Sequence, residues 1–211
     1  ARFPAPQYRV TDTRLPEGVR YALGFKDVTA PTNARTMIAA IVPESGYGNT
    51  LPVLLPPAGM AGPAYARISS LLLATMASFV YDFLARQKVQ GKHLNWFVVE
   101  QLPVIPPAHF DDPLPAAFTT RMRATGLMNG HHPQPSVADF VIPQVLALSY
   151  TAHDLAPFAR DLGYVDAQGQ VLPPITWDDE DRRARLAALD ALFFHLYGLG
   201  QDDAAYVTMG G

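Results

Sequence analysis

The chain has 211 residues and a mass of 23.0 kDa; 49% of its residues are hydrophobic and 17% are charged. This composition excludes a disordered chain and predicts one domain, or one domain with an appended subdomain, around a substantial core. The absence of cysteine excludes a disulfide scaffold, a thiolate zinc site and a cysteine nucleophile. Because no secretory signal is visible and the longest uncharged apolar stretch, 68–81, is too short to span a bilayer, we expect a cytoplasmic protein without a membrane partner.

The net charge of −3 conceals an asymmetry between the two halves of the chain. Residues 1–100 carry ten Lys or Arg and six Asp or Glu, whereas residues 101–211 carry six and thirteen, so the halves have net charges of +4 and −7. Arginine supplies 13 of the 16 cations, and its guanidinium group suits phosphate and guanine, although an arginine-rich genome explains this ratio equally well. The overall negative charge is therefore no argument against a nucleic-acid partner for the basic half.

The start of the basic half predicts a small sheet. Residues 21–28 and 35–42 are mainly β-branched, aromatic or small, so we expect two strands joined by a turn at 31–33. The segments 43–49 and 52–63 are rich in proline and glycine, which predicts loops on either side of a short connection.

A long helix is expected next. Pro63 suits its first turn, where the missing N–H has no cost, and the polar run from Arg86 ends it. One face carries apolar residues at helical spacing, namely Tyr65, Ile68, Leu72, Met76, Phe79 and Phe83. The middle of the segment is apolar nearly all round, which indicates a buried helix. Residues 96–99 then predict a short strand.

The acidic half predicts mainly helices. Residues 140–150, interrupted by Pro143, and residues 152–162 fit helical patterns. Thr176 and Asp179 have the spacing of a capping box before a further helix, whose first turn holds four acidic residues. The apolar stripe of that helix consists of Leu186, Leu189, Phe193 and Leu196.

Gly198 and Gly200 are expected to end this helix before a last short one. Together the elements predict a mixed α/β (α+β) fold, with a small sheet and a long buried helix in the N-terminal half and a helical C-terminal half. We expect a basic, mixed α/β half at 1–110 and a mainly helical, acidic subdomain at 111–211.

Catalytic and metal-binding patterns are missing from the sequence. His131 and His132 are adjacent in a loop, where neighbouring side chains do not easily share one ion, and no His-Glu-x-x-His spacing occurs. Neither a Gly-x-Ser-x-Gly elbow nor a glycine-rich phosphate loop is present. Asp111 and Asp112 stand between prolines, as in a turn or a helix cap. We therefore expect no catalytic residue, no metal ligand and no cofactor site in this chain.

Polar and basic side chains gather in two places in the basic half. The first group surrounds the predicted turn and the second follows the long helix, and both include Lys or Arg together with Asn. Cations neutralise phosphates, while Asn and Arg read base edges. The candidate DNA-binding residues are Lys26, Asn33, Arg35, Arg86, Lys88, Lys92, His93 and Asn95. The alternative is an ordinary solvated rim of loops.

Three blocks of sequence carry a resemblance to a known family. They are F-K-D-V-T at 25–29 with N-A-R-T-M-I-A-A-I-V-P at 33–43; S-F-V-Y-D-F-L-A-R-Q-K-V at 78–89 with H-L-N-W-F at 93–97 and Q-L-P at 101–103; and L-D-A-L at 189–192 with H-L-Y-G-L at 195–199 and Asp203. This series resembles the C-terminal specificity region of bacterial adenine-specific DNA methyltransferases of type II restriction–modification and related phage-defence systems.

The resemblance implies a target-recognition (TaqI-like specificity) domain that is a fragment of a larger enzyme. Its expected partners are double-stranded DNA and an upstream catalytic domain of the same polypeptide, which would hold S-adenosylmethionine and an Asn-Pro-Pro-Tyr motif; a fused nuclease is an open alternative. Lys26 stands where the family has arginine, which keeps the charge but loses the fork geometry. After Tyr206 the family's Thr-Phe-Pro stretch is missing, which predicts a truncated C-terminus.

Some expectations compete with DNA contact. Arg35 is equally well explained as an ion-pair partner of Asp27 that braces the predicted hairpin, and the block around Tyr197 suits packing and a hinge. A second function class is a protein-interaction module, in which the exposed side of a helix over 184–197 docks a partner subunit. A stand-alone hydrolase that uses His and Asp is the third.

Overall fold

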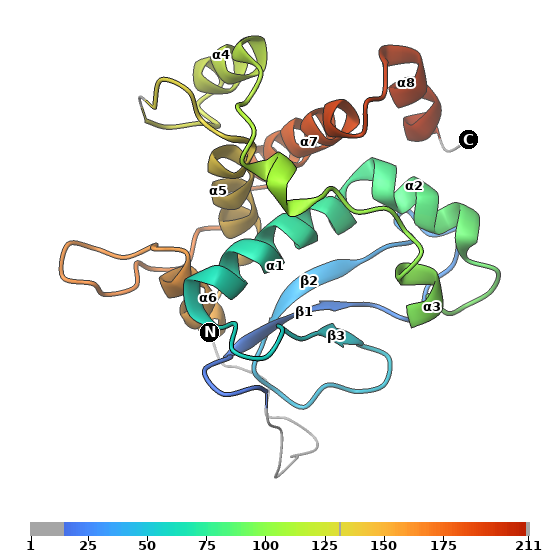
Figure 1. Ribbon diagram of the computed structural model, residues 1–211, viewed down its shortest axis with the longest axis horizontal. Helices are drawn as coiled ribbons and strands as arrows, with labels where there is room; N and C mark the ends of the chain where they lie inside the picture. Colours follow the sequence, from blue (N-terminus) through green and yellow to red (C-terminus); the bar gives the residue numbers. More distant parts are fainter. Residues whose placement is uncertain (1–14, 131, 210–211) are drawn as a thin grey trace.

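The computed structural model describes residues 15–130 and 132–209. In Figure 1 a small sheet lies on one side of the molecule and α1 crosses one face of it; α4, α5, α7 and α8 lie beyond α1, whereas α3 lies beside one end of the sheet. The strands are β1 (Tyr21–Phe25), β2 (Ala39–Pro43) and β3 (Val53–Leu54). The helices are α1 (Gly62–Ala77), α2 (Phe79–Lys88), α3 (Trp96–Val99), α4 (Ala116–Ala124), α5 (Val137–Ser149), α6 (Ala156–Asp161), α7 (Asp179–Leu196) and α8 (Gln201–Met209), with 3₁₀ turns η1 (Pro107–Phe110) and η2 (His153–Leu155). The predicted mixed α/β class, with its helical C-terminal half, is confirmed.

The sheet is antiparallel, with the strand order β2-β1-β3. Tyr21 pairs with Pro43 and Phe25 with Ala39, so the two predicted strands form one ladder but are shorter than expected. β1 is buried along its whole length because strands flank both of its edges and α1 covers one face. β3 was missed, since its two residues follow Pro52 within a segment that the prolines marked as a loop.

The single long helix predicted from Pro63 is wrong, because the chain forms α1 and α2 with a 65° bend between them. Ser78 has an extended backbone, and its Oγ accepts a hydrogen bond from the Tyr81 N–H as the N-cap of α2. A carboxylate distant in sequence, Asp190, accepts the Phe79 N–H at 2.8 Å and satisfies a second free donor of that helix start. Within 15–130 and 132–209, no single helix is both long and apolar enough to cross a membrane, although α1 and α2 reach that length and composition together.

The short strand predicted at 96–99 is also wrong. These residues form the one-turn helix α3, in which the N–H groups of Val98 and Val99 donate to the Asn95 carbonyl. Trp96 packs edge-on against the Phe25 ring, with a centroid separation of 5.1 Å. This contact with the sheet holds the segment in a turn, so tertiary packing overrides the strand preference of valine and tryptophan.

The helix signals in the acidic half need three corrections. Asp178, not Thr176, is the N-cap of α7 and accepts from the Asp181 N–H at 2.7 Å. The capping box of this half instead joins Ser136 to Asp139 at the start of α5. Pro143 does not interrupt α5; it is exposed, and the carbonyl that it frees four residues earlier lies on an exposed turn. α4 and η1 had no recognised sequence signal.

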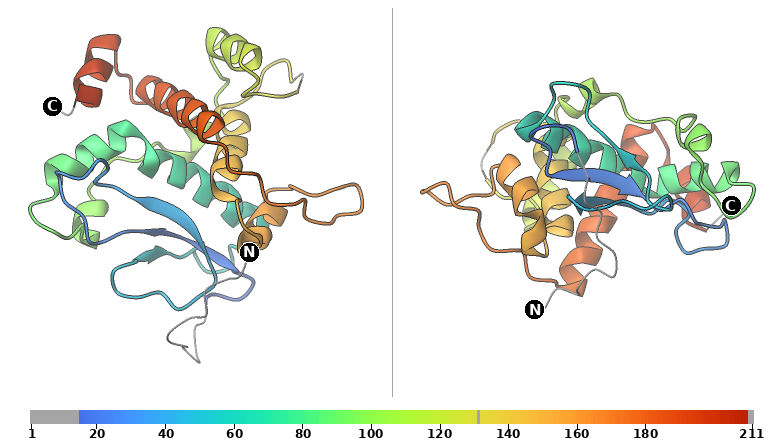
Figure 2. Two further views of the ribbon diagram at one scale, coloured as in Figure 1. Left: turned by 180° about the vertical axis from the view of Figure 1, so that it is seen from behind. Right: turned by 90° about the horizontal axis from the view of Figure 1, so that it is seen from below.

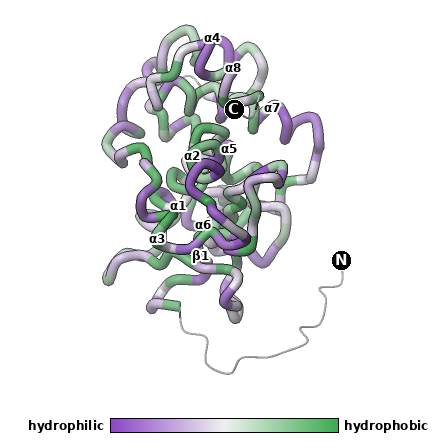
Figure 3. The backbone as a smooth tube through the Cα atoms, turned by 90° about the vertical axis from the view of Figure 1, so that its right-hand side faces the viewer, coloured by the Kyte–Doolittle hydropathy of each residue, from purple (hydrophilic) through white to green (hydrophobic). Residues whose placement is uncertain are grey.

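Both halves of the chain contribute to one continuous core. Phe25 and Met37 from the basic half belong to the same buried cluster as Phe140 and Phe193 from the acidic half. In Figure 3 hydrophobic segments gather around α1, α2 and α5, and hydrophilic segments are frequent at the periphery. The helical half therefore stabilises the sheet that carries the candidate site.

Candidate nucleic-acid interface

The two groups of polar residues predicted from the sequence are neighbours in space. The segment that follows β1 pairs with the segment that follows α2: the Thr29 N–H donates to the Lys92 carbonyl at 3.0 Å. One step further along, the Leu94 N–H donates to the Asp27 carbonyl at 2.8 Å. These bonds extend the edge of the sheet beyond β1 and bring together side chains that are more than sixty residues apart in sequence.

We use the name basic edge for Lys88 together with the exposed polar residues on and next to this pairing, so that it consists of Lys26, Lys88, Lys92, His93 and Asn95. Lys88 is the last residue of α2, and the other members lie on the two paired segments. In the part of the chain that the structure describes, none of the three lysine side chains has an ion-pair or hydrogen-bond partner. Their charges are therefore available to an anionic ligand.

His93 is anchored to the buried carboxylate of Asp27. Its Nδ1 lies 2.8 Å from Asp27 Oδ2, and Asp27 is only 9% exposed. The predicted ion pair between Asp27 and Arg35 is thus wrong, because Asp27 is turned toward His93. The bond fixes the imidazole ring and leaves Nε2 without a partner among the described residues.

Arg86, in contrast, is engaged inside the molecule. Its guanidinium donates to the carbonyls of Pro31 at 2.8 Å and Ala34 at 3.3 Å, and to Asp82 Oδ2 at 3.1 Å. Asn33 donates to the Thr29 hydroxyl in the same turn at 3.3 Å. Both predicted contact residues therefore hold the turn between β1 and β2.

Asp82 is the centre of this arrangement. Its Oδ1 accepts the N–H groups of Thr36 and Met37, both at 2.7 Å, and it is 3% exposed. We call Asp82, Arg86 and the turn at 30–37 the brace. Because most of these bonds lie on buried or half-buried atoms, the brace fixes the geometry of the chain behind the basic edge.

Arg35 connects the brace to the acidic half. Its guanidinium lies over the Phe79 ring at 3.7 Å, and Nη2 is 3.6 Å from Asp190 Oδ2, while Nη1 is buried without a partner among the described residues. Burial raises the pKa of Asp190 to about 6, although the Phe79 N–H and Arg35 favour its charged form. The structural role proposed for Arg35 is confirmed, but its partner is Asp190.

A polar pocket opens next to the basic edge, with a volume of about 360 Å³. Its walls include Asp27 and Asn95, which the sequence singled out, and Tyr47, Asn49 and Trp96, which it did not. The missed residues belong to a glycine-rich loop and to α3. The only available signal was that polar residues in loops on a rigid sheet often bind ligands.

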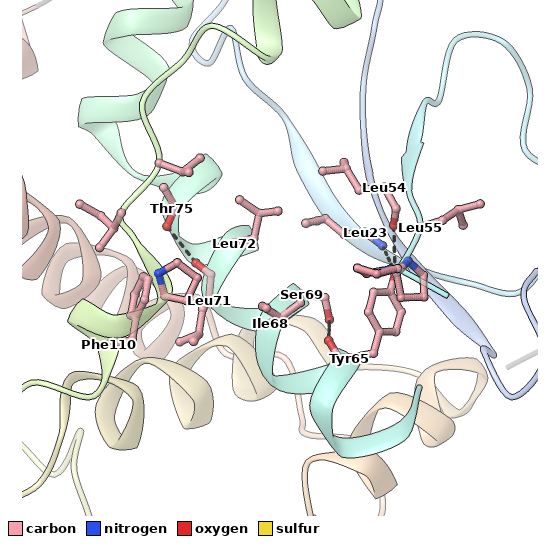
Figure 4. A pocket seen from close by; sticks show the side chains of 15 residues that line it. Leu23, Leu54, Leu55, Tyr65, Ile68, Ser69, Leu71, Leu72, Thr75 and Phe110 are labelled. Carbon is pink, nitrogen blue, oxygen red and sulfur yellow. Dashed lines mark hydrogen bonds between the residues drawn. The ribbon is translucent and has the colours of Figure 1, made fainter. Parts of the chain in front are cut away.

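An apolar pocket of about 300 Å³ lies between α1, β3 and the segment 104–110 (Figure 4). The hydroxyls that face it are bonded within the chain: Tyr65, Ser69 and Thr75 each donate to a backbone carbonyl, at 3.0, 2.7 and 2.9 Å. The remaining lining residues are apolar, so this pocket offers no activated nucleophile or general base.

The remaining residues that the sequence singled out are the histidines, Asp111 and Tyr197. No cluster of three or more His, Asp or Glu side chains that could hold a metal ion occurs in residues 15–130 and 132–209; His131 lies outside the described residues. Asp111 forms an ion pair with Arg67. Tyr197 donates to the Pro103 carbonyl at 2.8 Å, which supports the packing role expected of it.

Comparison with protein-family models, with curated proteins and with solved structures gives no match for this chain. The resemblance to a methyltransferase specificity region therefore rests on the sequence blocks themselves. Any functional conclusion has to be supported by the geometry of the basic edge and of the pocket beside it.

Proposed function

We propose that this chain recognises duplex DNA sequence-specifically, as the target-recognition domain of an adenine-N6 DNA methyltransferase of a restriction–modification or related phage-defence system. The observation that carries the proposal is the basic edge, where three exposed lysines that have no partner among residues 15–130 and 132–209 stand beside His93 and Asn95. Phosphate contacts position a protein on DNA and contacts to base edges specify the sequence, and this edge offers side chains for both.

The members of the edge divide into two roles. Lys26, Lys88 and Lys92 would neutralise phosphates, and His93 and Asn95 would reach the edges of bases. His93 is fixed by Asp27, so it would meet DNA in one orientation. The sequence also predicts DNA contact by Asn33, Arg35 and Arg86, and that prediction is untested. Because each of these side chains already has partners within the protein, we propose that the basic edge makes the contacts on which the salt slope depends.

The charge distribution supports a DNA-facing basic edge. The acidic first turn of α7, with Asp179, Glu180 and Asp181, follows a loop that projects from the opposite side of the molecule, as both Figure 1 and the left view of Figure 2 show. These three carboxylates therefore lie away from the basic edge, where they weaken attraction to phosphates little. Asp202 and Asp203, in contrast, are on α8, which packs against α2.

The parent enzyme is part of the proposal. S-adenosylmethionine and the catalytic residues would belong to an upstream domain of the same polypeptide, the chain itself would carry no cofactor, and the complex would act in the cytoplasm. Such enzymes do chemistry on a base that has left the duplex, while the recognition domain grips the DNA on either side.

Salt dependence of duplex binding tests the proposal. For Lys88→Ala combined with Lys92→Ala, the slope of log K against log salt should fall by about 1.8, which is about 0.9 for each lost phosphate contact. The matched control is Arg160→Ala combined with Arg183→Ala, which removes two exposed cations from α6 and α7. Unchanged affinity and slope for the lysine variant would contradict the assignment.

One observation favours the second candidate function, docking of a partner subunit through the helical half. A groove of about 290 Å³ runs between α4 and α7, and Ala184, Ala187, Ala188 and Ala191 form its α7 side. Small side chains allow a partner helix to approach closely. A chain that binds no duplex above a neutral control but retains a partner subunit would favour this function instead.

A further inference from the structure

The polar pocket beside the basic edge has the features of a binding site for a flat, uncharged ligand. It lies between the loop that connects β2 to β3 and the start of α3. Its lining includes the apolar residues Leu51, Pro52 and Leu94, and Trp96, which is 41% exposed, adds an aromatic surface. Because Trp96 is packed against Phe25, its ring is held in place before a ligand arrives.

Three polar side chains line the pocket with hydrogen-bonding capacity to spare. Asp27 uses Oδ2 for His93, and its Oδ1 has no partner within the described residues. The side-chain amides of Asn49 and Asn95 are exposed and likewise without partners in that part of the chain. The Tyr47 hydroxyl, in contrast, is already bonded to the Pro43 carbonyl at 2.8 Å. The pocket thus offers one carboxylate acceptor and two amides that both donate and accept.

This combination selects the chemistry of the ligand. A carboxylate in the wall disfavours a phosphate, whose charge is better matched by the lysines outside the pocket. An amino group suits the carboxylate, and a ring nitrogen next to it suits an asparagine amide; adenine and cytosine carry both along one edge. The exposed indole gives such a base a face on which to stack.

We propose that this pocket holds an adenine or cytosine base that has left the helical stack. A stacked base shows only its groove edges, which protruding side chains read, whereas a concave pocket admits a base only after it is extruded. Asp27 accepts from the exocyclic amino group, Asn95 donates to the ring nitrogen, and Trp96 stacks on the ring. The inference rests on the proposed function, since the basic edge would hold the duplex next to the pocket.

Nucleosides test the pocket without involving phosphate contacts. In a Trp177→Phe protein, Trp96 is the sole tryptophan and reports on the pocket by its fluorescence. Deoxyadenosine or deoxycytidine should quench it saturably, about fivefold more tightly than thymidine, and the two titrations show which base is preferred. Asn95→Ala should abolish the quenching, and Asp27→Asn should remove the preference because an amide donates as well as accepts. Asn129→Ala, an exposed amide in another loop, is the control.

Absence of saturable quenching by every nucleoside would overturn the inference, as would an unchanged preference in the Asn95→Ala and Asp27→Asn proteins. These outcomes can be distinguished from results that would contradict the proposed function. A protein that binds duplex with a steep salt dependence but no nucleoside would refute the pocket alone. A protein that binds nucleosides but no duplex would refute the recognition of DNA and leave the pocket in place.

Discussion

The basic edge and the brace use the same kinds of residue for opposite purposes. In the basic edge, Lys26 and Lys92 extend into solvent without partners in the described chain. In the brace, Arg86 donates to three acceptors, two of them in half-buried hydrogen bonds. The difference follows from the carboxylates: Asp82 forms an ion pair with Arg86, whereas the Asp27 carboxylate pairs with His93 and, within the described chain, with none of the lysines. Among cations that are close together in the sequence, those that pair with a buried carboxylate therefore become structural, and the others stay exposed.

Asp190 extends this comparison to the second half of the chain. It contributes to the net charge of −7, yet it is buried at the start of α2 next to Arg35. One carboxylate of the acidic surplus thus lies in the interior, where it connects α7 to Arg35 in the turn of the brace. Such a carboxylate does not repel DNA from the basic edge in the way that an exposed one would.

Removing the central carboxylate of the brace should have the largest effect. Asp82→Ala leaves two backbone N–H groups and Arg86 without their acceptor in a buried site, which we expect to lower the free energy of unfolding by about 3–5 kcal/mol. Urea unfolding measures this loss. Asp112→Ala, at an exposed position, is the control and should stay within about 0.5 kcal/mol of the parent. A comparable small change for Asp82→Ala would show that the brace does not stabilise the fold.

The pH dependence of stability tests Asp190. Its pKa is raised to about 6 in the folded chain, so its contribution is fully present below its unfolded pKa of 3.8 and is lost as the pH rises through 6. The folded state holds the proton more tightly over this window, and the loss amounts to about 3 kcal/mol. Asp190→Asn keeps an acceptor for the Phe79 N–H and has no proton to lose, so its stability relative to the parent should rise by most of that amount between pH 4 and pH 7. A constant difference across this range would contradict the raised pKa.

The sequence predicted local structure correctly where neighbouring residues determine it. The fold class, the ladder between β1 and β2 and the start of α1 near Pro63 all followed from residue pattern and turn chemistry. The break at Ser78 did not, because apolar spacing continues through it and Asp190, which satisfies the new helix start, is distant in sequence. The turn at 96–99 depends in the same way on the contact between Trp96 and Phe25.

In the candidate site, too, the sequence predicted residue types but not contacts between distant residues. Lys26, Lys92 and His93 were recognised by type, and the structure brings them together. Which cations stay exposed was not predictable, because it depends on Asp82 and Asp190, which contact residues distant from them in sequence. The pocket was missed because its walls come from three segments that meet only in the folded chain.

The most direct test compares one cation from each region, Arg86→Ala and Lys92→Ala, by urea unfolding and by duplex affinity as a function of salt. Arg86→Ala should lower the free energy of unfolding by about 1–3 kcal/mol, because it removes three hydrogen bonds, and should leave the salt slope of the folded protein unchanged. Lys92→Ala should leave stability unchanged and lower the slope by about 0.9. A lower slope for Arg86→Ala, with no change for Lys92→Ala, would contradict the assignment of DNA binding to the basic edge.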